Sequence, residues 1–195
     1  MHKVHYQITP HNINSHLFSV QLSFKSEADT SYHLSLPAWL PGSYMIRDFA
    51  KNIIELSATD EGNQALLTEK SDKQTWAITA TGSQVIVNYQ VFAFDLSVRT
   101  AYLDNQRGFF NGSSTFLQVE ELADQPCLLT IQNSPESNNE QPNNWRVATG
   151  LRRARTTEKY AFGDYVADDY AELIDGPVAL GDFDSFEFTV EGVVH

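Results

Sequence analysis

Apolar and polar residues alternate with a period of two along much of this chain, a pattern typical of strands with one buried face. The segment from Phe18 to Phe24 shows this most clearly, because every second residue is apolar and those between are Ser or Gln. Many short strands of this kind predict an all-β domain built as an antiparallel β-sandwich. The other segments that we expect to be strands are residues 4–8, 32–36, 54–58, 76–79, 115–119, 128–131 and 186–190.

Residues 85–98 contain a change in the phase of this alternation. The apolar residues are odd-numbered from Val85 to Val91 and even-numbered from Phe92 to Val98. Because a shift of one residue turns side chains to the opposite face of a strand, we expect a bulge or sharp bend near Val91 and Phe92.

One short helix is expected near the C-terminal end. Asp169 is suited to cap its first turn, Glu172 stands where a capping box requires an acidic residue, and Gly176-Pro177 ends the helix.

Asn111-Gly112 is typical of a two-residue hairpin turn. Residues 133–144, rich in Asn with two Pro, predict a flexible surface loop that is too short to separate two domains. We therefore expect residues 1–195 to form a single domain.

The charge balance limits the partners of this chain. It has 13 basic and 25 acidic side chains, a net charge of −12, so a large basic face for nucleic acid is not expected. No segment has the run of about 20 apolar residues that a membrane-spanning helix needs, and the N-terminus lacks the apolar core of a secretory signal. A single cysteine excludes an intramolecular disulfide. We expect a cytoplasmic protein with no nucleic-acid or membrane partner.

The usual catalytic motifs are missing from the sequence. There is no HExxH zinc helix and no G-x-S-x-G elbow, and His2 and His5 would face opposite sides of a strand. Cys127 begins an apolar segment and is expected to be a buried structural thiol. We therefore expect no catalytic residue, metal or other cofactor in this chain.

Charged residues near the C-terminal end are expected to be structural. The acidic run over residues 164–184 lacks the spacing of a calcium-binding loop, which favours a solvated face and a helix cap. Arg152, Arg153 and Arg155 are expected to pair with that run or with another domain, and anion binding is the alternative.

Two stretches are unusual for a plain sandwich. Residues 36–49 combine two prolines and a glycine with Trp39, Tyr44 and Phe49, which favours either packing over the sandwich end or contact with another domain. Residues 99–114 place Arg, Asn and Ser beside Phe109-Phe110, which fits a polar pocket or, as the plainer interpretation, a rigid hairpin with both Phe in the core.

Four blocks of sequence resemble the N-terminal region of the glycyl aminopeptidase family, gluzincin metallopeptidases with a thermolysin-like zinc domain and usually a PDZ domain. The resemblance runs from about Tyr6 to His195. The blocks, in order, are LPAWLPGSYMIRDFAKNI, VFAFDLSVRTAYLDNQRGFFNGSSTFL, WRVATGL and DDYAELIDGPVALGDF.

The resemblance implies that this chain is the noncatalytic β-rich domain of a longer zinc aminopeptidase that prefers small N-terminal residues such as Gly. In that family the zinc ligands and the PDZ domain lie further along, and no position in residues 1–195 matches the HExxH motif. The expected zinc therefore belongs to the parent's catalytic domain. The expected partners are that catalytic domain and, through it, a peptide substrate, for which this domain would serve as scaffold and one wall of the cleft.

Within that family interpretation, the candidate substrate-binding residues are Arg107, Asn111 and Ser113, followed by Tyr44 and Arg47. An Asn side-chain oxygen can accept a hydrogen bond from the substrate's ammonium group, whereas Arg107 suits a carboxylate or holds the loop in place.

The alternative is a self-sufficient binding module, for example a carbohydrate-binding sandwich that stacks sugars on exposed Trp39, Trp76 or Trp145. The C-terminal residues Val193-Val194-His195 favour a domain cut from a longer chain, because a module is expected to finish in a polar tail. An exposed apolar patch would favour the same interpretation.

Overall fold

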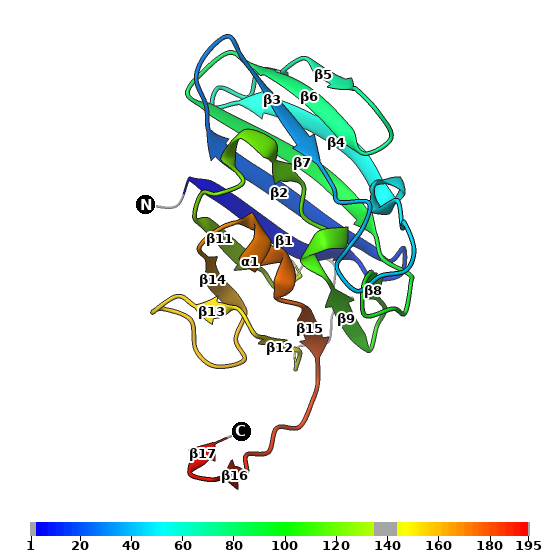
Figure 1. Ribbon diagram of the computed structural model, residues 1–195, viewed down its shortest axis with the longest axis vertical. Coiled ribbons are helices and arrows are strands. Elements are labelled where there is room, and N and C mark those ends of the chain that lie inside the picture. The colour runs from blue at the N-terminus through cyan, green and yellow to red at the C-terminus, as the bar shows by residue number, and fades with distance from the viewer. Residues whose placement is uncertain (1–2, 135–143, 195) are drawn as a thin grey trace.

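A computed structural model describes residues 3–134 and 144–194 of the chain (Figure 1). Most of the predicted 133–144 loop, with His2 and His195, lies outside the described residues. The largest sheet has seven strands in the spatial order β13-β14-β11-β1-β2-β7-β4. Their bounds are β1 (Val4–Asn12), β2 (Leu17–Lys25), β4 (Ile53–Asp60), β7 (Gln84–Phe92), β11 (Cys127–Ile131), β13 (Arg152–Arg153) and β14 (Gly163–Ala167).

Two four-stranded sheets and one small hairpin complete the strands among the residues that the structure describes. The first smaller sheet has the order β10-β3-β6-β5 and the second has the order β12-β15-β9-β8. The bounds are β3 (Thr30–Ser35), β5 (Thr68–Lys70), β6 (Thr75–Ala80) and β10 (Gln118–Val119), then β8 (Ala101–Leu103), β9 (Arg107–Phe110), β12 (Arg146–Thr149) and β15 (Val178–Gly181), and in the hairpin β16 (Thr189–Val190) and β17 (Val193–Val194).

The hydrophobic core lies between one face of the seven-stranded sheet and the two smaller sheets. Phe24 of β2 contacts Tyr32 of β3 with ring centroids 5.1 Å apart, and Phe18 of β2 contacts Phe110 of β9 at 5.5 Å. Burial of this apolar face is the main driving force for packing the layers together. The predicted all-β class is confirmed, and the predicted strands at 4–8, 18–24, 32–36, 54–58, 76–79 and 128–131 overlap β1, β2, β3, β4, β6 and β11.

The pairing of β1 with β11 departs from the antiparallel arrangement. These strands run parallel, with Val4 opposite Cys127, whereas the other pairings among the described strands are antiparallel. A parallel pair needs a long crossover connection. Here the connection from β1 to β11 includes strands of both smaller sheets and also β2, β4 and β7 of the large sheet, so β1 and β11 are neighbours in the sheet although they lie far apart in the chain.

The end of β7 corrects the expected change of phase. The strand ends at Phe92, and its buried phase simply continues to Ala93. Phe94, Leu96 and Val98 follow outside the strand and are exposed. The even-numbered apolar residues are thus a surface feature, and the local sequence pattern cannot distinguish such a row from a buried strand face.

Two further strand predictions are wrong in part. Of residues 115–119, Gln118–Val119 form a strand, and of residues 186–190 Thr189–Val190 do so, while Phe186 is exposed. The expected Asn111-Gly112 hairpin is also wrong, because these residues begin a 3-10 helix.

The predicted helix is confirmed, and Asp169 caps its first turn as expected, whereas Glu172 reaches back to Asp168 and not to the N-cap residue. Asp169 is its N-cap and accepts a hydrogen bond from the Glu172 backbone N–H at 2.8 Å, while Glu172 accepts one from the backbone N–H of Asp168. No helix among the described residues has the length and apolar character needed to cross a bilayer. The helices are η1 (Phe49–Asn52), η2 (Gly112–Ser114), η3 (Glu120–Leu122) and α1 (Tyr170–Asp175).

Candidate functional site

A groove of about 690 Å³ lies where three of the sequence blocks meet, and we call it the loop groove. The 36–48 loop provides Leu40 and Pro41, the turn before β8 provides Arg99, the N-cap of η2 provides Asn111, and α1 forms the remaining side. The α1 side consists of Asp169, Ala171, Glu172, Ile174 and Asp175. Residues far apart in sequence are therefore brought to one concave surface.

The chemistry of the loop groove is an apolar lining with charges of both signs. Leu40 and Ile174 pack against the core, whereas Arg99 and Asp175 carry opposite charges. Glu172 is already paired with Arg152, whose Nη2 lies 3.2 Å from its carboxylate, so Asp175 is the exposed carboxylate of the groove without such a pairing among the described residues. This arrangement suits a ligand with one cationic group and a small apolar part.

Asn111 is half-buried and lines the loop groove, but its side chain is also the N-cap of η2. Its Oδ1 accepts from the Ser113 backbone N–H at 3.2 Å and from Ser113 Oγ at 2.5 Å, while its Nδ2 donates to the Val98 carbonyl at 3.4 Å. An amide oxygen has two lone pairs. Both are engaged here, so Asn111 shapes the groove and Asp175 is the open acceptor for a cation.

Ser113 and Arg107 do not join Asn111 at the loop groove. Ser113 is fully buried behind Asn111. Arg107 is exposed at the start of β9, where its guanidinium lies 5.6 Å from the Tyr102 ring centroid. It lines a separate groove of about 650 Å³, the edge groove, with apolar residues such as Leu96. The structure thus divides the predicted RGFFNGSS site between two surfaces.

Tyr44 and Arg47 lie on the ordered 36–48 loop. Ser43 organises this loop: its carbonyl accepts from Trp39 Nε1 at 2.7 Å, and its Oγ accepts from Arg47 Nε at 3.4 Å. The Arg47 backbone N–H also donates to the Ala38 carbonyl at 2.8 Å. These bonds hold the loop while the side chain of Tyr44 is fully exposed, together with Met45 and Ile46.

The edge groove is bordered by a column of stacked rings. His16 stacks on Phe94 with centroids 3.9 Å apart, and Phe94 stacks on Tyr102 at 5.4 Å. The exposed Leu96 and Val98 continue this apolar surface. An exposed apolar patch, the feature that favours a domain with a missing partner over a self-sufficient module, is therefore present beside the edge groove.

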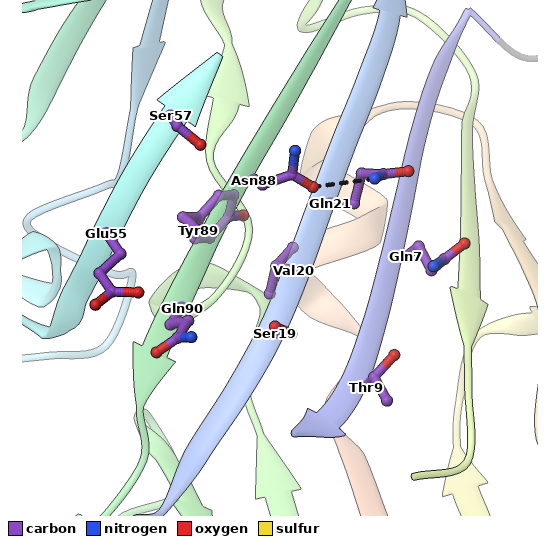
Figure 2. Close-up of a pocket in the computed structure, with 10 residues that line it drawn as sticks. All are labelled: Gln7, Thr9, Ser19, Val20, Gln21, Glu55, Ser57, Asn88, Tyr89 and Gln90. Atoms are coloured by element: carbon purple, nitrogen blue, oxygen red, sulfur yellow. Dashed lines mark hydrogen bonds between the residues drawn. The ribbon is translucent and has the colours of Figure 1, made fainter. Parts of the chain in front are cut away.

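A third hollow, of about 380 Å³, lies on the outer face of the seven-stranded sheet (Figure 2). Side chains of β1, β2, β7 and β4 line it, and Gln21 Nε2 donates to Asn88 Oδ1 at 3.0 Å. Its carboxylate comes from Glu55, which has a left-handed φ of 55° at a bulge in β4. The hollow offers hydrogen bonds without a nucleophile and base pair, and none of the residues that line it belongs to the predicted site.

The exposed side chains do not favour a sugar-stacking module. Trp76 and Trp145 are 7% and 5% exposed, so neither presents a face to a ligand. Trp39 is half exposed, with its indole N–H engaged by Ser43. Trp76 and Trp145 are therefore excluded as exposed rings on which a sugar could stack.

The remaining predicted chemistry is structural. Cys127 is buried, and burial raises the pKa of its thiol to about 12. Arg152 pairs with Asp168 at 2.6 Å as well as with Glu172, which bears out the expected pairing for this arginine. Across residues 3–134 and 144–194 there is no cluster of three or more metal-binding side chains, so the residues present do not fit a zinc ion.

The residues that sequence analysis missed are Leu40, Arg99 and Asp175. All three carried a weak signal, since each lies inside a block that resembles the glycyl aminopeptidases. Their separation along the chain concealed that they line one groove. Only the packing of α1 beside η2 reveals this.

Comparison with known proteins gives one family and several related folds. Residues 5–182 match the model of the Peptidase M61 N-terminal domain. The structure matches an aminopeptidase N family protein from Idiomarina loihiensis with a TM-score of 0.89 and 41% identity, over 98% of this chain and 31% of that one. This chain thus spans about a third of that protein's length.

A more distant match shows the fold alone. The M1 zinc metallopeptidase from Deinococcus radiodurans aligns with a TM-score of 0.51 and 8% identity, over 98% of this chain and 44% of that one. Comparison with curated protein sequences gives no match.

Proposed function

We infer the function of this chain from its family, because it belongs to the Peptidase M61 N-terminal domains. The chain is an N-terminal domain of the aminopeptidase type, as its 41% identity to the Idiomarina loihiensis protein also indicates. The finer role is our proposal: residues 1–195 are a single noncatalytic domain that serves as scaffold and as one wall of the substrate cleft in a longer zinc aminopeptidase.

The loop groove is the observation that carries this proposal. It is concave, partly apolar and acidic at Asp175, and it collects residues from three of the four family-like blocks. A peptide's free amino end is an ammonium group, which a carboxylate attracts and to which it can accept a hydrogen bond. We therefore assign the amino end of the substrate to Asp175, beside the turn shaped by Asn111. A preference for small first residues such as Gly remains part of this proposal.

The exposed apolar side chains near the loop groove support contact with a catalytic domain. Tyr44, Met45 and Ile46 lie on a loop whose backbone is tied by hydrogen bonds, and the same loop supplies Leu40 and Pro41 to the groove. Aromatic and Met side chains are enriched in interfaces between proteins. The proposed cleft would then have the 36–48 loop at its border with the attached catalytic domain.

Zinc chemistry is assigned to that attached domain. The described residues contain no cluster that fits the metal, and the longer relative leaves more than two thirds of its length for other domains. This domain's own contribution is binding and orientation, without a step in bond cleavage.

The test is a charge-removing substitution in the full-length enzyme. Asp175→Asn keeps the size of the side chain and removes its charge. Loss of one charge-assisted hydrogen bond to the substrate should raise KM for glycyl chromogenic substrates by about tenfold. The matched control is Asp29→Asn, in the exposed turn between β2 and β3, where KM should not change.

Unchanged kcat and KM in Asp175→Asn would contradict the cleft-wall assignment. A decrease in both kcat and KM in Asp175→Asn would contradict it as well. So would a rise in KM in the Asp29→Asn control that equals the rise in Asp175→Asn. Asn111→Ala provides a second measurement, because it removes the cap of η2 beside the groove, and it should also raise KM.

A further inference from the structure

We propose that three buried tyrosines, Tyr6, Tyr89 and Tyr170, are positioning residues that hold the η2 turn against α1 and so set the shape of the loop groove. This inference rests on the proposed function of that groove. The tyrosines touch neither the groove nor a substrate, because none of them is among the residues that line it.

The three tyrosine hydroxyls bind three consecutive backbone carbonyls. Tyr89 donates to the Thr115 carbonyl at 3.0 Å, Tyr170 to that of Phe116 at 2.7 Å and Tyr6 to that of Leu117 at 2.8 Å. The tyrosines come from β7, α1 and β1, so three separate elements converge on one short segment. Tyr89 also accepts from the Leu117 backbone N–H at 3.1 Å.

Residues 115–117 need these partners because of where they lie. The segment is buried but belongs to no helix or strand, so regular backbone pairing does not satisfy its carbonyls. A buried carbonyl without a hydrogen bond is costly, and side chains are the alternative partners. The Phe116 ring packs against the Tyr6 ring, and their centroids are 5.1 Å apart.

The clamped segment is tied directly to Asn111. Thr115 Oγ1 and Ser114 Oγ both donate to the Asn111 carbonyl, at 3.1 Å and 2.9 Å. The Phe116 backbone N–H donates to the Gly112 carbonyl at 2.8 Å. A displacement of residues 115–117 would therefore move the backbone of Asn111, which lines the groove.

Tyr170 links the two sides of the loop groove. It is the first residue of α1, the helix that carries Asp175, and its hydroxyl binds the segment that follows η2. Burial raises the pKa of all three tyrosine hydroxyls, which favours the protonated form that donates these hydrogen bonds. The hydroxyl of Tyr170 thus connects the helix to the turn.

The experiment compares Tyr→Phe substitutions in the full-length enzyme. Tyr170→Phe and Tyr89→Phe each remove one clamping hydroxyl. The control is Tyr165→Phe, because Tyr165 is also a buried residue and its hydroxyl donates to the Ala161 carbonyl at 2.7 Å, away from the η2 turn and in a less buried setting. We expect some loss of thermal stability in all three variants, but a rise in KM for glycyl substrates of about fivefold or more in the first two only.

A second variant covers the case in which a tyrosine variant does not fold. Thr115→Val is nearly isosteric and removes one of the two hydroxyls that bind the Asn111 carbonyl. It should raise KM in the same direction, by a smaller factor. If Tyr89→Phe, Tyr170→Phe and Thr115→Val all have the same KM as the Tyr165→Phe control, the positioning role is overturned.

The outcomes separate this inference from the proposed function. If Asp175→Asn raises KM and the tyrosine variants behave like Tyr165→Phe, the positioning role alone is wrong. If Asp175→Asn leaves KM unchanged, the cleft-wall assignment is wrong, and with it the positioning role stated here. A raised KM in Asp175→Asn, Tyr89→Phe and Tyr170→Phe supports both.

Discussion

Gly112 lies so close to Ile174 that a β-carbon at position 112 would be 2.9 Å from the Ile174 Cα. The same β-carbon would be 3.1 Å from the carbonyl oxygen of Leu173. The η2 turn and α1 are therefore in backbone contact, which only glycine permits at this position. Since Asn111, the N-cap of η2, and residues of α1 line the loop groove, this contact fixes the spacing between its two sides.

Gly112→Ala should destabilise the domain by about 1–3 kcal/mol, because the added methyl meets backbone atoms that cannot move independently. Urea unfolding measures this free energy. Gly150→Ala is the matched control, since a β-carbon there meets nothing within 4 Å. We expect the control to change stability by at most about 1 kcal/mol. Equal effects at both positions would contradict the close contact.

The pair His33 and Glu121 predicts a pH dependence of stability. His33 Nδ1 lies 2.7 Å from Glu121 Oε1, and the hydrogen bond to Glu121 raises the pKa of His33, with the negative charge of Glu121 adding to the effect. A histidine whose pKa is raised by folding contributes its full stabilisation at pH values below its pKa in the unfolded chain, which is about 6.5. This contribution is lost as the pH rises through its pKa in the folded protein.

Glu121→Gln should therefore lower the free energy of unfolding at pH 5.5 more than at pH 8.5. The effect is expected to be small, because both side chains are partly exposed and solvent screens their interaction. Urea unfolding of both proteins across this pH range measures it. If the difference in free energy of unfolding between the two proteins grows as the pH rises, the trend is opposite to the expected one. That result would show that the contact between His33 and Glu121 is not formed in solution.

Cys127 should be unreactive in the folded protein. Its side chain is buried at the start of β11, and burial, with a smaller contribution from the charge of Asp169, raises the thiol pKa to about 12. The thiolate is the reactive form of cysteine. Labelling with a maleimide at pH 8 should be slow in buffer and rapid in denaturant, whereas rapid labelling of the native protein would contradict the burial.

The isolated chain should lack aminopeptidase activity even with added zinc. No described cluster of side chains fits the metal. Activity on glycyl and alanyl chromogenic substrates, measured for this chain and for the full-length enzyme, tests the assignment, and removal of zinc by a chelator should abolish activity in the longer protein. Activity of the isolated chain that a chelator removes would reveal a metal site in this domain.

Local sequence patterns predicted the elements whose signals are complete within a few residues. The alternation in 18–24 predicted β2, and the Asp169 and Glu172 pair predicted the first turn of α1. Asn111-Gly112 misled, because an Asn can cap a helix as readily as it begins a hairpin turn. The choice between the two depended on α1, which lies about 60 residues further along the chain.

The candidate site was only partly predictable. Asn111 was identified and lines the loop groove, whereas Ser113 is buried and Arg107 belongs to the edge groove. Asp175 was interpreted as part of a solvated acidic face. No pattern of charges within the chain indicates which carboxylate will line the same groove as Asn111, because that depends on how the layers pack.

By itself, the sequence determined the all-β class, the main strands, the helix cap and the family, because alternation, capping and ordered blocks depend on short stretches of chain. The tertiary structure decided the parallel pairing of β1 with β11, the exposure of the row from Phe92 to Val98 and the meeting of η2 with α1. These features depend on contacts between distant residues. Their free energy comes from burial and backbone hydrogen bonds that exist only once the sheets have packed together.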